Sequence, residues 1–327
     1  MRKLIFRQII ASICLMLLIF DSKCAFEGAK TGLDLCAKTV IPSLFPFFVV
    51  SMMLTASLGN MDFQLLCWLA DLLDIPQAAA PILIPAFLGG YPVGAKTVTD
   101  QYRNGIIEKQ EAERLLAFCS NAGPSFLFGM VAAFFSDKQV AWQLWIIHIL
   151  GAVFTAKIYP SPLLNDKKLE KVHHAKPHKE LMGSAVTAMG IVCGWIIVFR
   201  ILIAFLNKWL FWLLPQWMQV LAIGILELSN GCYELMRVTD IGLRFVICSC
   251  MLAFGGVCVL LQTCSVTEGL SLRHYLIGKM IQTLFSLVVS AIVSIKHEFL
   301  YLFIMVFLIG IPVKGKNRGR NPKLYPV

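Results

Sequence analysis

Apolar stretches long enough to cross a bilayer recur along the whole chain, and they constrain its fold more than any other feature. A helix needs about 20 apolar residues to cross a hydrocarbon core of roughly 30 Å. Backbone polar groups have no water to bind there, so they must be satisfied within helices. We therefore expect an all-α, polytopic membrane protein with about eight transmembrane helices, at residues 5–20, 36–58, 115–135, 139–159, 184–206, 241–265, 274–295 and 299–313.

The charges agree with this interpretation. Charged residues make up 15% of the chain, against about a quarter in soluble domains. The net charge of +10 gathers in three stretches outside the apolar segments: the N-terminus, residues 160–183 and the tail. Cytoplasmic retention of Lys and Arg produces such a distribution, so we expect the N-terminus, residues 96–114, the linker 160–183 and the tail to lie inside. Nucleic-acid binding is not expected.

Two further apolar stretches, at about 62–95 and 208–235, are interrupted by proline, glycine and polar residues. Proline removes a backbone donor and glycine loosens a helix. We expect both stretches to be re-entrant hairpins, because non-helical backbone at membrane depth needs surrounding protein or a water-filled cavity. The transmembrane spans that flank the first hairpin then cross the membrane in the opposite direction to the corresponding spans that flank the second hairpin. This is an inverted-topology repeat, which places a substrate site near the bilayer midplane.

The predicted domain organisation follows from the order of these spans and hairpins. It comprises an N-terminal signal-anchor helix and loop (1–35), a first repeat (36–159), a cytoplasmic linker (160–183), a second repeat (184–295), and a last helix with a basic cytoplasmic tail (296–327). No catalytic triad or metal-ligand spacing is present, and the 11 cysteines form no Cys-x-x-Cys pair. We expect no enzyme activity, no cofactor and no metal.

The first hairpin carries a glycine-rich stretch at 87–97. It fails the phosphate-loop pattern by one residue, because Ala95 separates Gly94 from Lys96. Glycines permit unusual backbone angles, and freed amide groups at a hairpin tip can meet an anionic ligand. A purely structural loop is the alternative. The candidate binding residues are Gly89, Gly90, Tyr91, Gly94 and Lys96.

A polar cluster then interrupts the predicted span 115–135. Scattered small residues usually aid helix packing, but an Asn-x-Gly-Pro sequence favours a break in the helix. The candidate binding residues in this cluster are Ser120, Asn121, Gly123 and Ser125.

The second hairpin places Glu227, Ser229 and Asn230 at its tip. A buried acid in a membrane is costly and by default marks a proton, ion or substrate path. Glu227 is therefore a candidate for coupling transport to a proton. A structural salt bridge to Arg200 or Arg244 is the alternative.

The span 241–265 contains Gly255, Gly256 and Gln262 where its counterpart contains the Asn-x-Gly-Pro break, and these are the remaining candidate site residues. Two other features are interpreted structurally. Gly190 and Gly194 are typical of a helix-packing seam, and the charged stretch 104–114 predicts a short helix with a solvated face.

The sequence resembles a known family at these motifs. Gly-Gly-Tyr-Pro-Val-Gly-Ala-Lys (89–96), the run 111–129, Glu-Leu-Ser-Asn-Gly (227–231) and Phe-Gly-Gly (254–256) with Gln262 resemble the YlbJ/SpoVV sporulation integral membrane proteins, which have nucleoside-recognition Gate domains. The resemblance covers roughly residues 35–295. It implies a fold similar to concentrative nucleoside transporters. For the sporulation members it also implies passage of dipicolinate across the outer forespore membrane.

We therefore expect a multi-pass cell-membrane transporter of a small anionic or heteroaromatic solute, dipicolinate first. Lys96 and the hairpin amides would attract carboxylates, and the polar side chains of the breaks and tips would bind the ring. A nucleoside-type permease and a non-transporting membrane scaffold are the alternatives. H⁺ or Na⁺ as a coupling ion and a homo-oligomeric assembly both stay open.

Overall fold

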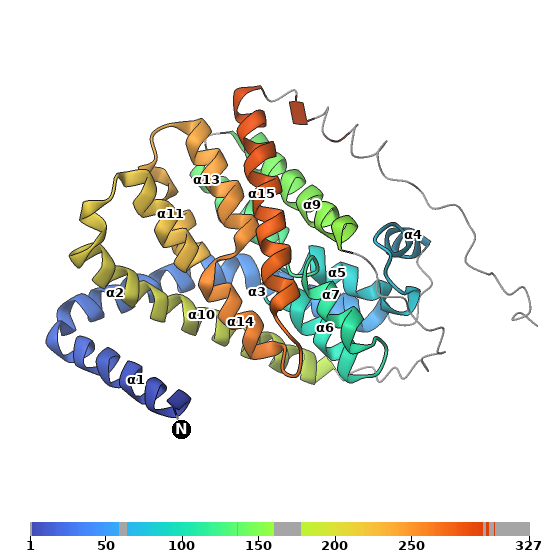
Figure 1. The fold of residues 1–327 in the computed structure, drawn as a ribbon, viewed down its shortest axis with the longest axis horizontal. Coiled ribbons are helices and arrows are strands. Elements are labelled where there is room, and N and C mark those ends of the chain that lie inside the picture. The colour runs from blue at the N-terminus through green and yellow to red at the C-terminus, as the bar shows by residue number, and fades with distance from the viewer. Residues whose placement is uncertain are drawn as a thin grey trace, which may run out of the picture.

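The computed structural model describes residues 2–58, 64–135, 137–159, 178–296, 299–300 and 304, and every regular element among them is a helix (Figure 1). The all-α prediction is confirmed for this part of the chain. Most of the predicted linker, the tail and most of the predicted span 299–313 lie outside the described residues.

The α-helices are α1 (Arg2–Phe20), α2 (Ser22–Leu35), α3 (Ile41–Leu58), α4 (Gln64–Leu72), α5 (Leu83–Phe87), α6 (Val93–Arg103), α7 (Lys109–Leu116), α8 (Pro124–Gly129), α9 (Lys138–Ile158), α10 (His178–Trp209), α11 (Gln216–Leu226), α12 (Leu228–Glu234), α13 (Ile241–Phe254), α14 (Gly256–Val266) and α15 (Arg273–Ile295). A π-helical turn, Cys36–Val40, joins α2 to α3. Short 3₁₀ segments cover Gln77–Ile82, Val131–Phe134, Phe211–Leu213 and Leu235–Arg237.

Five helical stretches among the described residues are long and apolar enough to cross a membrane. They are Ser22–Val50, Gln139–Ile158, Met182–Trp209, Ile241–Val266 and Arg273–Ile295. The chain is therefore a multi-pass integral membrane protein, as the sequence predicts. The predicted break within the span 115–135 is confirmed, because the chain unwinds between α7 and α8 at residues 117–123.

Two groups of helices surround the centre of the molecule. α10 runs beside α2 and α3, while α15 packs between α13 and α9 (Figure 1). Small residues allow the close contact of α2 with α10: a Cβ added at Gly28 or Gly32 would lie about 3 Å from the Cα atoms of Ile201 or Ile197.

Gly190 and Gly194 of α10 do not form the predicted packing seam within the described chain. A Cβ added at either glycine would meet nothing within 4 Å. The packing seam on this pair of helices therefore belongs to α2. A Gly-x-x-x-Gly sequence shows only that one face of a helix carries small residues. Whether another helix packs on that face depends on the tertiary structure around α10.

The charged stretch 104–114 contains the predicted short helix, α7, and its residues 108–110 are exposed, but its other face is buried and not solvated. Arg114 is 3% exposed and Glu111 is 0% exposed, with 2.8 Å between Arg114 Nη1 and Glu111 Oε1. Arg114 also donates to the carbonyl oxygens of Leu73 at 2.8 Å and Asp74 at 3.2 Å. These carbonyls follow the end of α4 and need donors once buried. The pair therefore anchors α4 to α7.

Candidate functional site

The first hairpin ends in a non-helical tip. α5 ends at Phe87, α6 begins at Val93, and Gly90 between them has a φ of 75°, a conformation that favours glycine. The tip lies against the break of the next segment: a Cβ added at Gly123 would be 3.0 Å from the Gly90 nitrogen and 3.1 Å from its Cα. Only glycine permits this backbone-to-backbone approach.

The break at 117–123 frees backbone groups that neighbouring side chains satisfy. Asn121 Nδ2 donates to the Phe118 carbonyl at 2.7 Å and to the Ala86 carbonyl at 3.2 Å. The Ala122 amide donates to His148 Nε2 of α9 at 3.0 Å. Asn121 therefore holds the first hairpin and the break together, and the unwound backbone is compensated inside protein.

The second hairpin is capped by its own acid. Glu227 separates α11 from α12, and it accepts hydrogen bonds from the Ser229 amide at 3.0 Å and the Asn230 amide at 2.6 Å. Asn230 Nδ2 adds a third at 2.7 Å. Glu227 is 2% exposed, so a buried carboxylate stands at the N-terminus of α12, where unpaired amides favour negative charge.

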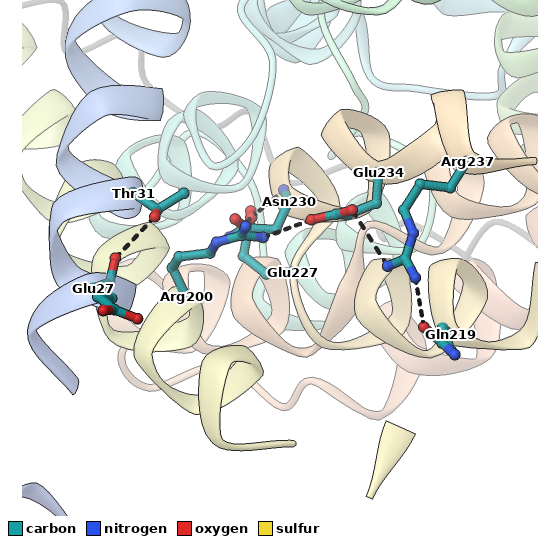
Figure 2. Close-up of polar contacts among 8 residues, drawn as sticks. All are labelled: Glu27, Thr31, Arg200, Gln219, Glu227, Asn230, Glu234 and Arg237. Atoms are coloured by element: carbon teal, nitrogen blue, oxygen red, sulfur yellow. Dashed lines mark hydrogen bonds and ion pairs between the residues drawn. The ribbon is translucent and has the colours of Figure 1, made fainter. Parts of the chain in front are cut away.

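The predicted alternative, a salt bridge from Glu227 to Arg200 or Arg244, is wrong. Figure 2 shows Arg200 extending from α10 to Glu234, with 3.1 Å between Nη1 and Oε1. Arg244 donates to the Val238 and Phe134 carbonyls. Both arginines pair with other groups, and the hydrogen bonds of Glu227 go to residues of its own hairpin tip.

The second break lies at Gly255 and Gly256, both with positive φ, between α13 and α14. The first hairpin tip reaches this break as well: Tyr91 Oη donates to the Leu252 carbonyl at 3.2 Å, and a Cβ at Gly255 would lie 3.3 Å from the Tyr91 ring. A Cβ at Gly256 would lie 2.9 Å from the Gly224 carbonyl of α11. The first tip thus lies between both breaks.

A small cavity, here called the central cavity, forms where these parts meet. Its volume is about 30 Å³, room for roughly one water molecule. It is too small for an organic solute, and this arrangement is here called the closed form. The predicted site residues that line it are Gly90, Tyr91, Gly123, Glu227, Ser229 and Gln262.

Other predicted residues support the tips and breaks from behind the cavity wall. Asn121 and Asn230 make the hydrogen bonds described above. Gly89 lies in the first hairpin tip, and Gly255 and Gly256 form the second break. Gly94 packs against the Cys119 carbonyl. The buried hydroxyls of Ser120 and Ser125 have no hydrogen-bond partner among the described residues.

Lys96 lies away from the central cavity. Its ammonium is 2.8 Å from the Asp100 carboxylate one turn along α6. It lines a larger cavity of about 410 Å³ together with α10 residues such as Ser184 and Thr187, here called the Lys96 cavity.

A third cavity of about 570 Å³, here called the Arg200 cavity, lies between α2 and the far end of α10. The three cavities use one face of α10 in succession, because the lining residues repeat every three or four positions. In order they are Gly183, Ser184, Thr187, Ala188 and Ile191 at the Lys96 cavity, Val192 and Ile196 at the central cavity, and Arg200, Ala204, Asn207 and Lys208 at the Arg200 cavity.

Sequence reasoning missed a buried polar group on α9 and α15. Lys279 Nζ donates to Tyr91 Oη at 3.1 Å and to Gln282 Oε1 at 2.8 Å. Gln282 Nε2 in turn donates to Asn121 Oδ1 at 3.2 Å and the His148 carbonyl at 3.1 Å. The available signal was a lone lysine inside an apolar span, which by default marks a functional site.

The described residues contain no group of three or more His, Cys, Asp or Glu side chains that could hold a metal ion. No family model matches the chain, and no solved structure does. A curated relative is 27% identical over 86% of this chain and 81% of its own length, the Sporulation integral membrane protein YlbJ of Bacillus subtilis (strain 168). The chain is thus a multi-pass, YlbJ-like integral membrane protein, a distant homologue whose similarity supports membership of the YlbJ family.

Proposed function

We propose that this chain transports a small organic solute across the membrane, dipicolinate in a sporulating host, through a site at the central cavity. The access to that site alternates between the Lys96 cavity and the Arg200 cavity. The dipicolinate assignment comes from the resemblance of the tip and break motifs to the sporulation family. The transport assignment has separate physical support.

The single observation that carries the proposal is the row of three cavities along α10. From Gly183 to Lys208 the helix rises about 37 Å, at roughly 1.5 Å per residue, which is enough to cross a bilayer core of about 30 Å. The central cavity lies at the middle of this length, where Val192 and Ile196 face it. A scaffold protein has no need for such a row.

The order of elements supports the inverted repeat in this proposal. A long helical stretch (α2 with α3), a hairpin with a tip before α6, a broken segment (α7 and α8) and a span (α9) form one half. The helix α10, a hairpin with a tip before α12, a broken segment (α13 and α14) and the span α15 form the other. Transporters built this way bind their solute where tips and breaks meet.

The positive charges give the proposed orientation. By the positive-inside rule the Lys96 cavity faces the cytoplasm and the Arg200 cavity faces the opposite side. Lys96 would then meet the solute at the cytoplasmic mouth of the path, whereas Glu227 and Gln262 would meet it in the central cavity. Glu227 is the proposed site of coupling to a proton, since it is a buried acid with no cation partner among the described residues.

Uptake by purified protein in proteoliposomes tests the proposal. We expect saturable uptake of radiolabelled dipicolinate, and its loss when Glu227→Ala and Asn121→Ala are combined. A Glu108→Gln protein, altered at an exposed position on α7's N-terminal side, is the matched control. Undiminished uptake by the double variant would reject these site assignments.

The same liposomes separate the alternatives. Uptake of nucleosides without dipicolinate would identify a nucleoside-type permease. If neither class of compound moves while the purified protein retains its fold, the transport proposal is wrong and the membrane-scaffold alternative stands.

A further inference from the structure

Lys279 is a buried lysine inside a membrane-spanning helix. It lies in α15, is 1% exposed, and belongs to a buried polar stripe on that helix made by Tyr275, Lys279, Gln282, Ser286 and Ser290. The spacing of three or four residues puts these side chains on one face, toward the interior of the molecule. A charge in this position is expensive and needs a functional or structural reason.

Every partner of the Lys279 ammonium is neutral. It donates to Tyr91 Oη and Gln282 Oε1, and it lies 5.0 Å from the Tyr91 ring centroid and 5.9 Å from the Tyr275 ring centroid. None of the ion pairs among the described residues includes it. Dipoles and ring faces compensate a buried ammonium only in part. The structure therefore contains a buried lysine without an acidic partner among the described residues.

The ammonium lies one side chain behind the central cavity. Tyr91 lines that cavity, and its hydroxyl stands between the cavity wall and Lys279. Tyr91 belongs to the first hairpin tip, which forms part of the wall of the central cavity. Displacement of the tip would bring a donor-rich cation to the cavity surface. Glu227 lines the same cavity from the second hairpin, and its hydrogen bonds go to Ser229 and Asn230.

We propose that Lys279 is the counter-ion for a carboxylate of the transported solute and makes the site selective for anions. In the closed form the Tyr91 hydroxyl and the Gln282 amide oxygen hold the ammonium. On binding, a carboxylate oxygen replaces Tyr91 as the acceptor, and a charge-assisted bond takes the place of a neutral one. This inference rests on the proposed transport function and assigns its charge selectivity to one residue.

A pair of ligands with the same ring tests the inference on purified full-length protein. Dipicolinate carries two carboxylates, whereas pyridine-2,6-dicarboxamide is neutral and similar in shape. Binding of each is measured by isothermal titration calorimetry for the wild type, Lys279→Gln, Lys279→Met, Lys279→Arg and the control Lys109→Gln, whose side chain is 56% exposed on α7.

We expect Lys279→Gln to weaken dipicolinate binding by about 30-fold, which corresponds to roughly 2 kcal/mol at 1.4 kcal/mol per factor of ten. Its affinity for the diamide should stay within about threefold of the wild type, because no ionic bond is lost. Lys279→Arg should retain most of the dipicolinate affinity, and Lys109→Gln all of it. Lys279→Met provides a second neutral side chain, with folding of each variant checked by size-exclusion chromatography.

Two results overturn the inference alone: dipicolinate binding that is unchanged in Lys279→Gln and Lys279→Met, or an equal loss of dipicolinate and diamide binding. Either would make Lys279 a structural residue that positions Tyr91. If the wild type binds neither compound, the proposed function fails and this inference fails with it.

Discussion

Gly90 and Gly123 lie backbone against backbone, and their contact joins the first hairpin tip to the first helix break. A Cβ at Gly123 would lie within 3.1 Å of the Gly90 nitrogen and Cα, and equally close to the Leu88 carbonyl. All three neighbours are backbone atoms, which cannot rotate away as a side chain would. The small size of the central cavity in this structure depends on the close backbone contact between Gly90 and Gly123.

Gly123→Ala should therefore destabilise the protein. We expect a loss of about 1–3 kcal/mol from forcing a methyl group into a packed backbone contact. Gly190→Ala is the matched control, because a Cβ there meets nothing within 4 Å and alanine favours the helix. Thermal unfolding in detergent measures both. Equal melting temperatures for the two variants would show that the tip and the break are not in contact.

Arg114→Met should also lower stability. The change leaves Glu111 buried without its cation and frees the carbonyls that follow α4. Breaking a buried pair from one side costs about 3–5 kcal/mol. Lys109→Met, on the exposed side of the same helix, is the control, and thermal unfolding is again the measurement. A neutral result would mean that Arg114 is solvated, as composition alone suggests.

The ion pair of Arg200 with Glu234 ties α10 to the end of the second hairpin. Both side chains are 13% exposed, so the pair is partly shielded from water. Arg200→Met and Glu234→Gln should each lower the melting temperature, and the double variant should lose less than the sum of the two. Neutral replacements are used because Glu234 also pairs with Arg237 at 3.5 Å, so a reversed charge at 234 would face that arginine. The coupling from the double-mutant cycle should be roughly 1–3 kcal/mol. Strictly additive effects would argue against the contact.

Glu227→Gln should impair transport more than folding. The amide keeps one acceptor oxygen, so the amides of Ser229 and Asn230 no longer share a carboxylate. We expect dipicolinate uptake to fall by about tenfold or more, equivalent to roughly 1.4 kcal/mol. If Glu227 carries the coupling proton, the remaining uptake should not respond to a pH gradient. A preserved response would assign the coupling elsewhere.

Sequence reasoning located the tips and the breaks because local chemistry determines them. Clusters of proline, glycine and polar residues interrupt these helices, whereas an isolated glycine such as Gly190 does not interrupt α10. A lone acid such as Glu227 has few reasons to lie in a membrane. For the same reason hydropathy located four of the five long apolar stretches. The first was misplaced at 36–58, because residues 22–35, predicted as part of a helix and loop, are helical and belong to the stretch Ser22–Val50.

Packing determined what the sequence did not predict. Lys96 lies in a motif that suggests ligand binding, yet Asp100 one turn along the helix pairs with it. Lys279 was overlooked inside a span that otherwise reads as apolar, and its role depends on Tyr91, which is distant in sequence. Arg114 is buried because distant carbonyls need donors. The outcomes for Lys279 and Arg114 depend on long-range neighbours that no local pattern identifies, whereas the Lys96 pair is a local i,i+4 contact within α6.

Cysteine labelling along α10 tests the central claim most directly. Single cysteines at Ala204, Ile196 and Thr187 place one reporter at each cavity, and Val198→Cys, on the exposed side of the helix, is the control. Each is introduced into a cysteine-free variant that retains uptake, because the native Cys24 lines the Arg200 cavity and would itself react. Each variant is exposed to a membrane-impermeant maleimide from either side.

We predict that Ala204→Cys reacts from one side only and Thr187→Cys from the other only. Ile196→Cys should react slowly from both sides and be protected by dipicolinate, while Val198→Cys should not react. A path along α10 would be contradicted if Ala204→Cys and Thr187→Cys reacted from the same side, or if Ile196→Cys remained unreactive from both.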